Sequence, residues 1–224
     1  MLKSQYRMLA TDYDSTIATK RVITPSAEKA LLQAKEAGFL LSIVTGRELN
    51  NLLRICPLIP MFDLIVAENG AVLYSPSNGQ IELLGDPPAI ELISQLMHHR
   101  IPFNQDRVMT TVESCYKEKV VSFIDELELP LHIIYHSSWM LILPLGVHKG
   151  YGLGKALARF NITSDQVIGF GDAENDFDLL EFCGFSVAVS NALDELKAKA
   201  DWVASKESGD GVAEFIWEFL IKGQ

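Results

Sequence analysis

The sequence predicts an α/β protein in which a doubly wound parallel sheet carries a smaller inserted α+β domain. Three observations support this prediction. Short apolar runs alternate with helical segments in both end regions of the 224-residue chain, which is the pattern of a parallel sheet wrapped by helices. These runs lack strict polar alternation, which suits strands covered on both faces. The middle region departs from the pattern, and "GDPP" and "PLG" at its ends are typical of domain boundaries.

The N-terminal region is expected to contribute three strands and one well-marked helix. Apolar runs indicate strands at 6–11, 39–44 and 63–67. Thr24 and Pro25 suit the N-cap and first turn of a helix that follows the first strand, and Gly38 suits its end. The buried stripe of this helix is expected to consist of Ala27, Ala30, Leu31 and Ala34.

The C-terminal region continues the alternation of helices and strands. Its expected elements are a helix near 149–160, a strand at 166–170, a helix from Glu174, a strand at 185–189, and a final helix, strand and helix. Together the two end regions predict a core domain made of residues 1–85 and 147–224.

Residues 86–146, called the insert below, differ in kind. The order there is helix, strand, helix and then the hairpin "LHIIYH-SS-WMLILP", which predicts a small α+β domain with an antiparallel sheet. The expected bounds are 89–99 for the first helix, 107–112 for the strand, 113–127 for the second helix, and 131–136 and 139–144 for the hairpin.

The composition excludes several classes of protein. A formal net charge of −10 argues against general binding to nucleic acid or to anionic membranes. The first thirty residues contain no continuous apolar segment of a signal peptide, and no later stretch approaches the roughly 20 apolar residues that span a bilayer. The three cysteines are odd in number and far apart, which fits reduced thiols. We therefore expect a soluble, cytoplasmic protein.

Polar side chains follow three of the expected parallel strands, where ligands bind in open α/β sheets. Asp12 and Asp14 follow the first strand, and "TGR" follows the second. A later strand ends in "GDAENDFD", which brings further carboxylates to the same edge. Carboxylates this close repel one another unless a cation compensates them, and an all-oxygen cluster favours Mg²⁺ over zinc.

These residues, taken in order, resemble the four motifs of a known superfamily. The motifs are Asp12-x-Asp14-x-Thr16, Thr45-Gly46-Arg47, Lys149-Gly150 and Gly171-Asp172-x-x-Asn175-Asp176, and "ENGA" after the third strand adds to them. The set is similar to the haloacid dehalogenase (HAD) superfamily, and more narrowly to its Cof-type, sucrose-phosphatase-like branch, subclass IIB. The resemblance covers almost the whole chain and implies a Rossmann-like core. It also implies that the insert is a cap domain.

The resemblance implies a Mg²⁺-dependent phosphatase that works through an aspartyl-phosphate. Asp12 would be the nucleophile and Asp14 the general acid and base. Thr45 and Lys149 would hold the phosphoryl oxygens. Ser15, Thr16, Gly46, Arg47 and Asn175 would contact the phosphate or substrate. The metal would be held by the Asp12 carboxylate, the Asp14 carbonyl, Asp172 and Asp176, the last either as a ligand or by orienting the others.

Ser15 departs from the family pattern, which usually has glycine at this position. Glycine lets backbone amides approach a phosphate closely, so we expect Ser15 to affect the loop geometry and the rate more than the type of reaction. The expected substrate is a small phosphorylated metabolite such as a sugar phosphate or phosphoglycolate. Its identity would depend on side chains of the insert such as Asn104, Arg107, Thr110 or His136. No pattern in the sequence specifies an oligomeric state.

Three alternatives share these motifs. A phosphomutase uses the same two aspartates but returns the phosphoryl group to its substrate. A phosphate-binding regulatory module that has lost catalysis would be consistent with Ser15. A dehalogenase would leave Asp14 and the acidic metal cluster without a role.

Other motif interpretations do not fit the residues of this sequence. "DAENDFD" has Phe177 and Cys183 where a calcium loop needs glycine and glutamate. "KGYGLGKA" lacks the first glycine and the final Ser or Thr of a phosphate-binding P-loop, and Lys155 breaks the dinucleotide-binding pattern. The five histidines fit no zinc spacing. Trp139 and Met140 in the hairpin are expected to be core residues; the alternative is that one of them borders the substrate.

Overall fold

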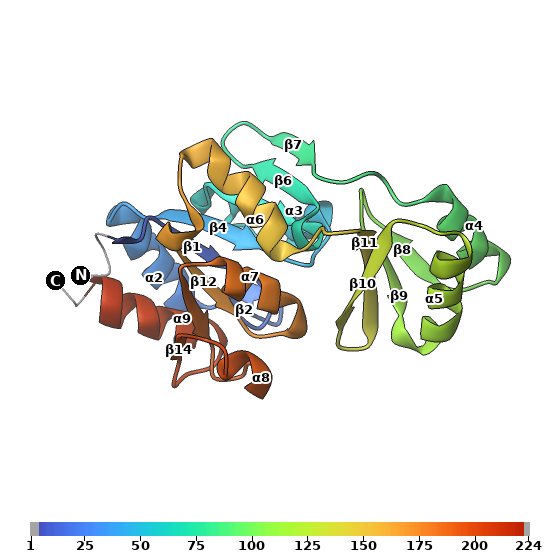
Figure 1. Cartoon of the computed structure of the whole chain (residues 1–224). Helices are drawn as coiled ribbons and strands as arrows, with labels where there is room; N and C mark the ends of the chain where they lie inside the picture. The colour runs from blue at the N-terminus through green and yellow to red at the C-terminus, as the bar shows by residue number, and fades with distance from the viewer. Residues whose placement is uncertain (1–4, 222–224) are drawn as a thin grey trace.

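The apolar runs form the centre of an eight-stranded sheet in the computed structural model, which describes residues 5–221 (Figure 1). In spatial order the strands are β14 (Trp202–Val203), β13 (Phe185–Ala188), β12 (Val167–Gly171), β1 (Met8–Thr11), β4 (Leu40–Val44), β5 (Leu64–Ala67), β6 (Val72–Ser75) and β7 (Gln80–Leu83). The six strands from β14 to β5 are parallel, with β1 at the centre between β12 and β4. The predicted fold class is confirmed.

Four short strands of the core were not expected from the sequence. β6 and β7 extend the sheet as an antiparallel hairpin, and β2 (Ala18–Thr19) pairs with β3 (Val22–Ile23) as a separate ribbon. All four residues of β7 are exposed, because this strand forms the edge of the sheet. Its residues therefore do not form the apolar run that marks the buried strands.

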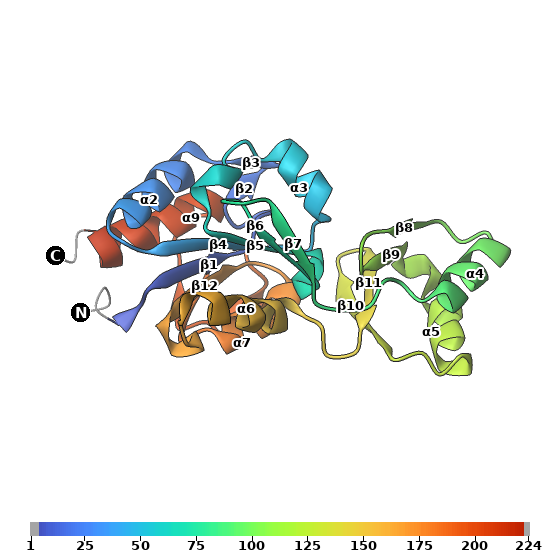
Figure 2. The same ribbon diagram turned by 90° about the horizontal axis from the view of Figure 1, so that it is seen from above.

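Helices cover both faces of this sheet (Figure 2). On one face lie α2 (Pro25–Glu36) and α9 (Ser208–Phe215), which continues as a π-helix over Ile216–Ile221. On the other lie α6 (Lys149–Leu157) and α7 (Phe177–Phe182). The core also contains α3 (Leu49–Ile55) and α8 (Asp194–Lys197).

Helix α2 shows how the sequence determines one of these elements. The Thr24 side chain accepts a hydrogen bond from the Ala27 amide, Pro25 occupies the first turn, and the four expected residues form the buried stripe. This prediction is confirmed. The stripe packs on the sheet in a cluster with Leu9, Leu41 and Phe170, while α6 and α7 pack in a second cluster on the opposite face.

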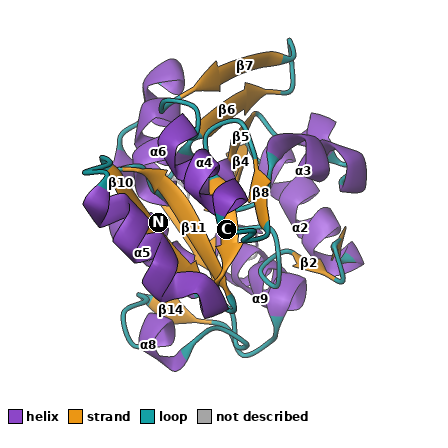
Figure 3. Cartoon of the chain, turned by 90° about the vertical axis from the view of Figure 1, so that its right-hand side faces the viewer, coloured by secondary structure: helices purple, strands orange, loops and turns teal. Residues whose placement is uncertain are grey.

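The insert forms its own four-stranded antiparallel sheet, separate from the core sheet. Its strands are β10 (Leu131–His136), β11 (Trp139–Pro144), β9 (Thr110–Glu113) and β8 (Phe103–Gln105), and its helices are α4 (Ile90–His98) and α5 (Lys117–Glu126). Figure 3 shows both helices in front of these strands, on the side away from the core. Leu96, Val120 and Met140 belong to the apolar cluster between them.

Two expected boundaries within the insert were wrong, and β8 was not expected. The strand expected at 107–112 begins only at Thr110, because the amides of residues 107–109 donate to a core side chain instead of to a neighbouring strand. The helix expected from Glu113 begins at Lys117 after a 3-10 turn over Ser114–Tyr116.

Within residues 5–221, no helix is both long and apolar enough to cross a membrane.

Candidate active site

The carboxyl ends of three adjacent strands bring the predicted site residues together. β1 ends directly before Asp12, β4 ends before Thr45, and β12 ends before Asp172. β12, β1 and β4 are neighbours in the sheet, so these side chains meet at one edge although they lie up to 160 residues apart in sequence. Lys149 reaches the same place from the first residue of α6.

Lys149 is completely buried between two carboxylates. Its Nζ atom lies 2.5 Å from Oδ1 of Asp12 and 2.5 Å from Oδ1 of Asp176. Burial acts to lower the pKa of Lys149, but the charges of Asp12 and Asp176 outweigh it and raise the pKa above its ordinary value. The ammonium group is therefore protonated at neutral pH, as a buried charge with two hydrogen-bonded partners should be.

One lysine faces three crowded carboxylates. Oxygens of Asp12, Asp172 and Asp176 lie within 4.8 Å of one another. Burial, followed by repulsion from Asp176, raises the pKa of Asp172 to about 7. Burial also raises the pKa of Asp12, and the Asp176 and Asp172 charges add to this effect against the opposing influence of Lys149. The cluster has more negative charge than Lys149 neutralises, and its donors are all oxygen, so it fits a hard divalent cation.

The two acids of the fourth motif have different surroundings. Both carboxylate oxygens of Asp176 accept hydrogen bonds from the protein: Oδ1 accepts from Lys149, and Oδ2 accepts from the amides of Asp172 and Ala173. Oδ1 of Asp172 accepts a 2.6 Å hydrogen bond from the Thr16 hydroxyl. Thr16 therefore contacts a carboxylate of the acidic cluster, whereas the sequence predicted a phosphate contact, and that contact stays a prediction.

Asp14 is held by Arg47. The guanidinium donates to both Asp14 oxygens, from Nε at 2.5 Å and from Nη2 at 2.6 Å, and its Nη1 donates to Asn51 at 2.7 Å. The carbon of the guanidinium also lies 5.8 Å from the centre of the buried Tyr13 ring. Such a bidentate pair fixes the plane of the carboxylate. The expected contact of Arg47 with phosphate or substrate stays a prediction, since its donors here are directed at Asp14 and Asn51.

Thr45, Gly46 and Asn175 lie side by side at the end of β4. Thr45 is buried, and its hydroxyl accepts a hydrogen bond from the Arg47 amide. A Cβ added at Gly46 would lie 3.2 Å from Nδ2 of Asn175, which in turn donates to Asn69. Asn69 was not among the predicted site residues, although it lies in the "ENGA" segment that supported the resemblance.

Gly70 in that segment has a clear steric role. A Cβ there would lie 2.0 Å from the His148 carbonyl oxygen, and the residue has a φ of 107°. Only glycine permits this approach of the two backbones. The contact fixes the start of α6, and with it Lys149, against the loop that follows β5.

Ser15 adopts the left-handed conformation that its place in the family motif suggests, with a φ of 60°. Its amide donates to the Ala18 carbonyl and its carbonyl accepts from Asn191, while its hydroxyl forms no hydrogen bond within residues 5–221. The loop geometry therefore depends on the backbone of Ser15 and not on its side chain.

The left-handed backbone of Ser15 can be tested with a matched pair of variants. Ser15→Gly should relieve the left-handed strain, which offsets the greater chain entropy of glycine when unfolded, and leave the free energy of unfolding within ~1 kcal/mol of the wild type. Ser15→Val should lower it by about 1–2 kcal/mol more, because a β-branched side chain is poorly accommodated at this φ. Urea titrations of both variants test this, and equal stabilities would contradict the strain argument.

A cavity of about 320 Å³ lies between these residues and the insert. Asp12, Asp14, Thr45, Arg47 and Asn175 line it from the core, and the hairpin β10–β11 contributes His136, Trp139 and Leu141. His136 Nδ1 lies 3.5 Å from Glu174 across the boundary. Trp139 therefore borders the cavity, whereas Met140 is a core residue of the insert.

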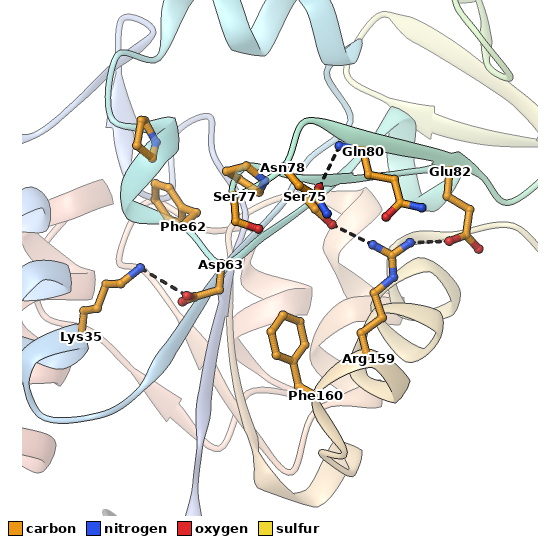
Figure 4. A pocket seen from close by; sticks show the side chains of 12 residues that line it. Lys35, Phe62, Asp63, Ser75, Ser77, Asn78, Gln80, Glu82, Arg159 and Phe160 are labelled. Carbon is orange, nitrogen blue, oxygen red and sulfur yellow. Dashed lines mark hydrogen bonds and ion pairs between the residues drawn. The ribbon is translucent and has the colours of Figure 1, made fainter.

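Two of the other cavities are more than twice as large. One of about 810 Å³ separates α3 from the insert and is lined by Arg47, Asn104 and Arg107 among others. The other, of about 700 Å³, lies near the amino ends of the strands, where Asp63 precedes β5 and Phe160 lies before β12 (Figure 4). Its charged groups pair with one another, Lys35 with Asp63 and Arg159 with Glu82, so neither of its two carboxylates is left without a cationic partner.

Asp106 lies beside the 810 Å³ cavity in an acidic environment. Burial, with smaller effects of Glu68 and Glu48, raises the pKa of Asp106 to about 7. The folded state therefore binds a proton on Asp106 that the unfolded chain releases near pH 4, so the free energy of unfolding decreases as pH rises from about 4 to 7.

Asp106→Asn should remove this penalty. We expect the variant to be more stable than wild type at pH 8, on the order of 1–2 kcal/mol after allowance for partial exposure, and equally stable at pH 4. Thermal melts of both proteins at the two pH values test the prediction. A gain of the same size at both values would show that the charge of Asp106 is not its cause.

Comparison with known proteins agrees with this geometry. The profile of the haloacid dehalogenase-like hydrolases matches residues 9–131 and 113–216, and the chain belongs to that family. Within the superfamily it is a phosphatase, and it shares its fold with a solved sugar phosphatase of subclass IIB, the branch that the motifs resemble.

The relatives and structures similar to this chain cover almost its whole length. A phosphoglycolate phosphatase of Methanothermobacter thermautotrophicus is 33% identical, over 96% of this chain and 99% of the relative. The pyridoxal phosphate phosphatase YbhA of Escherichia coli is 28% identical, over 96% and 99% of the two chains. A solved structure from Thermoplasma acidophilum has a TM-score of 0.82 at 17% identity, covering 97% of this chain and 99% of that one. A subclass IIB sugar phosphatase, BT4131, has a TM-score of 0.79 at 19% identity and similar coverage, 96% and 99%.

Proposed function

We propose that the chain hydrolyses a small phosphorylated metabolite through an aspartyl-phosphate formed on Asp12. The observation that carries this proposal is the pairing of two differently held aspartates in one cavity. Asp12 is fixed through one oxygen by Lys149, and its Oδ2 accepts no hydrogen bond from residues 5–221, whereas Asp14 is held by Arg47. One oxygen is thus available for attack on phosphorus, and a second carboxyl lies in the same cavity for proton transfer.

The residues around this pair have complementary roles in the proposal. Lys149 orients Asp12 and supplies positive charge for the phosphoryl oxygens, which the net charge of the chain does not. Thr45 would hold the phosphoryl group with its hydroxyl, and Asn175, which follows β12, would also contact it. Asp14 would protonate the leaving oxygen and then take a proton from the water that attacks the phosphoenzyme.

The acidic cluster fits Mg²⁺. Asp12 and Asp172 would supply carboxylate oxygens and Asp14 its carbonyl, while Asp176, whose oxygens already accept three hydrogen bonds, would orient its neighbours. When bound, the ion would offset the repulsion between the Asp12 carboxylate and the phosphate.

The insert, residues 86–146, would act as a cap, with the remainder of the chain as the core domain. His136, Trp139 and Leu141 would exclude water from the cavity while Asp12 is phosphorylated. The small cavity and the relatives named above support phosphoglycolate or another short phosphate ester as the substrate. We also propose a cytoplasmic location, supported by the absence of a disulfide among the three cysteines, all of them within the described residues.

Chelation tests this function. Purified protein should hydrolyse an aryl phosphate with Mg²⁺, lose roughly 100-fold in rate after treatment with EDTA, and recover when Mg²⁺ is restored. Ca²⁺ should not restore the rate, because its larger and looser coordination shell positions the nucleophile poorly. Full activity after exhaustive chelation would contradict the proposal.

The same preparation separates the alternatives. A phosphomutase would require a bisphosphate primer and would return the phosphoryl group to its substrate instead of releasing phosphate. A module that only binds phosphate would show no turnover under any metal condition. A panel of phosphorylated metabolites, including phosphoglycolate and pyridoxal phosphate, then identifies the substrate by its kcat/KM.

A further inference from the structure

Glu68 is a buried carboxylate at the boundary between the core and the insert. It follows β5 in the 3-10 helix η2 (Glu68–Gly70) and has no exposed surface. Its side chain accepts hydrogen bonds from three successive amides of the insert. They come from Arg107 at 3.3 Å, Val108 at 2.9 Å and Met109 at 3.2 Å.

These bonds explain how the fold tolerates a carboxylate in this place. Burial raises the pKa of Glu68, and the three amide bonds act in the opposite direction. A buried carboxylate without partners would be strongly unfavourable, whereas successive amides that converge on it supply the hydrogen bonds that water would otherwise give. Glu68 also has a φ of 49°, a left-handed conformation that is unfavourable for a non-glycine residue and is kept only where the surroundings enforce it.

The backbone of Glu68 is joined to the predicted phosphate loop. Its amide donates to the Arg47 carbonyl at 2.9 Å, and the next amide, of Asn69, donates to the Thr45 carbonyl at 2.9 Å. One residue therefore connects the loop that presents Thr45 and Arg47 with the insert segment 107–109.

On the insert side, the same segment leads directly to the cavity. Residues 107–109 precede β9, which pairs with β11 in a register that places Thr111 opposite Leu141 and Glu113 opposite Trp139. Trp139 and Leu141 are the residues of β11 that line the 320 Å³ cavity. Fixing the segment 107–109 thus fixes the wall of the cavity that the insert supplies.

Of the other polar contacts across this boundary, the one between Nε2 of His132 and the Val147 carbonyl, at 2.9 Å, lies where the insert returns to the core, and two more are exposed. His136 and Glu174 are 3.5 Å apart, and both side chains are more than two-fifths exposed. The contact between Arg107 and Asn50, at 3.3 Å, is also exposed. Exposed pairs of this kind contribute little free energy, so Glu68, which is buried, is the polar contact best placed to hold the insert, beside the apolar packing of Val108 and Met109 in the core cluster.

We propose that Glu68 is a positioning residue that locks the insert to the Thr45–Arg47 loop and so sets the position of Trp139 and Leu141 over the catalytic aspartates. It touches neither substrate nor metal and acts through the three amides. The part of this proposal that concerns catalysis rests on the proposed function, whereas the anchoring of the insert does not.

Glu68→Gln tests the proposal with Glu214→Gln as its matched control. Gln keeps the size of the side chain but places an amide donor among donors. Glu214 is a suitable control because it also accepts two backbone amides, those of Ser205 and Lys206, in a core loop remote from the insert. We expect Glu68→Gln to speed hydrogen exchange of the Val108 and Met109 amides by at least about tenfold while the exchange of Ile168 in β12 stays unchanged.

The kinetic readout separates positioning from stability. Glu68→Gln should lower kcat/KM for the best substrate of the metabolite panel by roughly 10- to 100-fold, mostly through KM, because the insert's contacts are displaced and Asp12, Asp14 and Lys149 are untouched. Glu214→Gln should leave kcat/KM unchanged. Faster exchange with unaltered kcat/KM, or unaltered exchange, would overturn the proposal. Wild-type protein without turnover would instead refute the proposed function.

A measurement on the unaltered protein decides the matter if Glu68→Gln does not fold. The amides of Val108 and Met109 lie outside any strand, so without Glu68 they should exchange as loop amides do. We expect them to exchange in the wild type as slowly as Met140, which lies within the sheet of the insert. Exchange at the rate of the exposed Asn78 turn would overturn the proposal.

Discussion

Asp12→Asn is expected to give a folded protein whose phosphatase rate is reduced at least ~10⁴-fold, since an amide is a poor nucleophile and a poor metal ligand. Folding should survive, because Lys149 keeps its contact with Asp176 and the variant removes a carboxyl whose pKa is raised by burial and by repulsion from Asp176 and Asp172. The measurement is steady-state release of phosphate from an aryl phosphate with Mg²⁺, together with a thermal melt.

Asp63→Asn is the matched control for this variant. Like Asp12, Asp63 contacts a lysine, and its side chain in addition accepts a backbone amide, but it precedes β5 at the opposite end of the strands (Figure 4). Its replacement should leave the rate unchanged. Turnover of Asp12→Asn within tenfold of the wild type would remove Asp12 as the nucleophile.

Asp14→Asn is expected to reduce the rate by roughly 10² to 10⁴, and by an amount that depends on the leaving group. The nucleophile stays in place, and the amide oxygen can still accept one hydrogen bond from Arg47. An alkyl phosphate needs its leaving oxygen protonated and should lose most, whereas an aryl phosphate releases a stable phenolate and should lose less in the first step.

In Asp14→Asn the second step, hydrolysis of the phosphoenzyme, should also be slowed. Activation of water also depends on Asp14, so hydrolysis of the phosphoenzyme should limit turnover of the aryl ester and produce a pre-steady-state burst of phenolate. Rapid-quench measurements with both esters test this. Equal losses for the two esters, without a burst, would show that Asp14 has a structural role.

Much of the core fold could be predicted because local signals agree with its tertiary structure. The buried stripe of α2 and its Thr24 cap need no information beyond the helix itself. The parallel strands are continuous apolar runs because both faces are covered. β7 and β8 were missed because each is short and largely exposed, so its sequence carries little of that signal.

The site could be predicted as a set of residues but not as a set of contacts. The order of the motifs placed Asp12, Thr45 and Asp172 at one sheet edge, and in the structure they lie there. The partners of Arg47 and Thr16 depend on side-chain directions that a motif does not encode. Glu68 belongs to "ENGA", but that segment gave no indication of its role, because its partners are backbone amides of a loop about 40 residues away.

The central claim, a phosphoryl group carried on Asp12, can be measured directly. Wild-type protein would be mixed with Mg²⁺ and the best substrate of the panel, quenched in acid within milliseconds, and digested with trypsin. Cleavage after Arg7 and Lys20 releases a peptide, residues 8–20, that contains both aspartates. We predict that this peptide gains the mass of one phosphoryl group, that fragmentation places it on Asp12, and that Asp12→Asn abolishes it. Rapid turnover with no phosphorylated peptide at any quench time, or with the label on Asp14, would contradict the account.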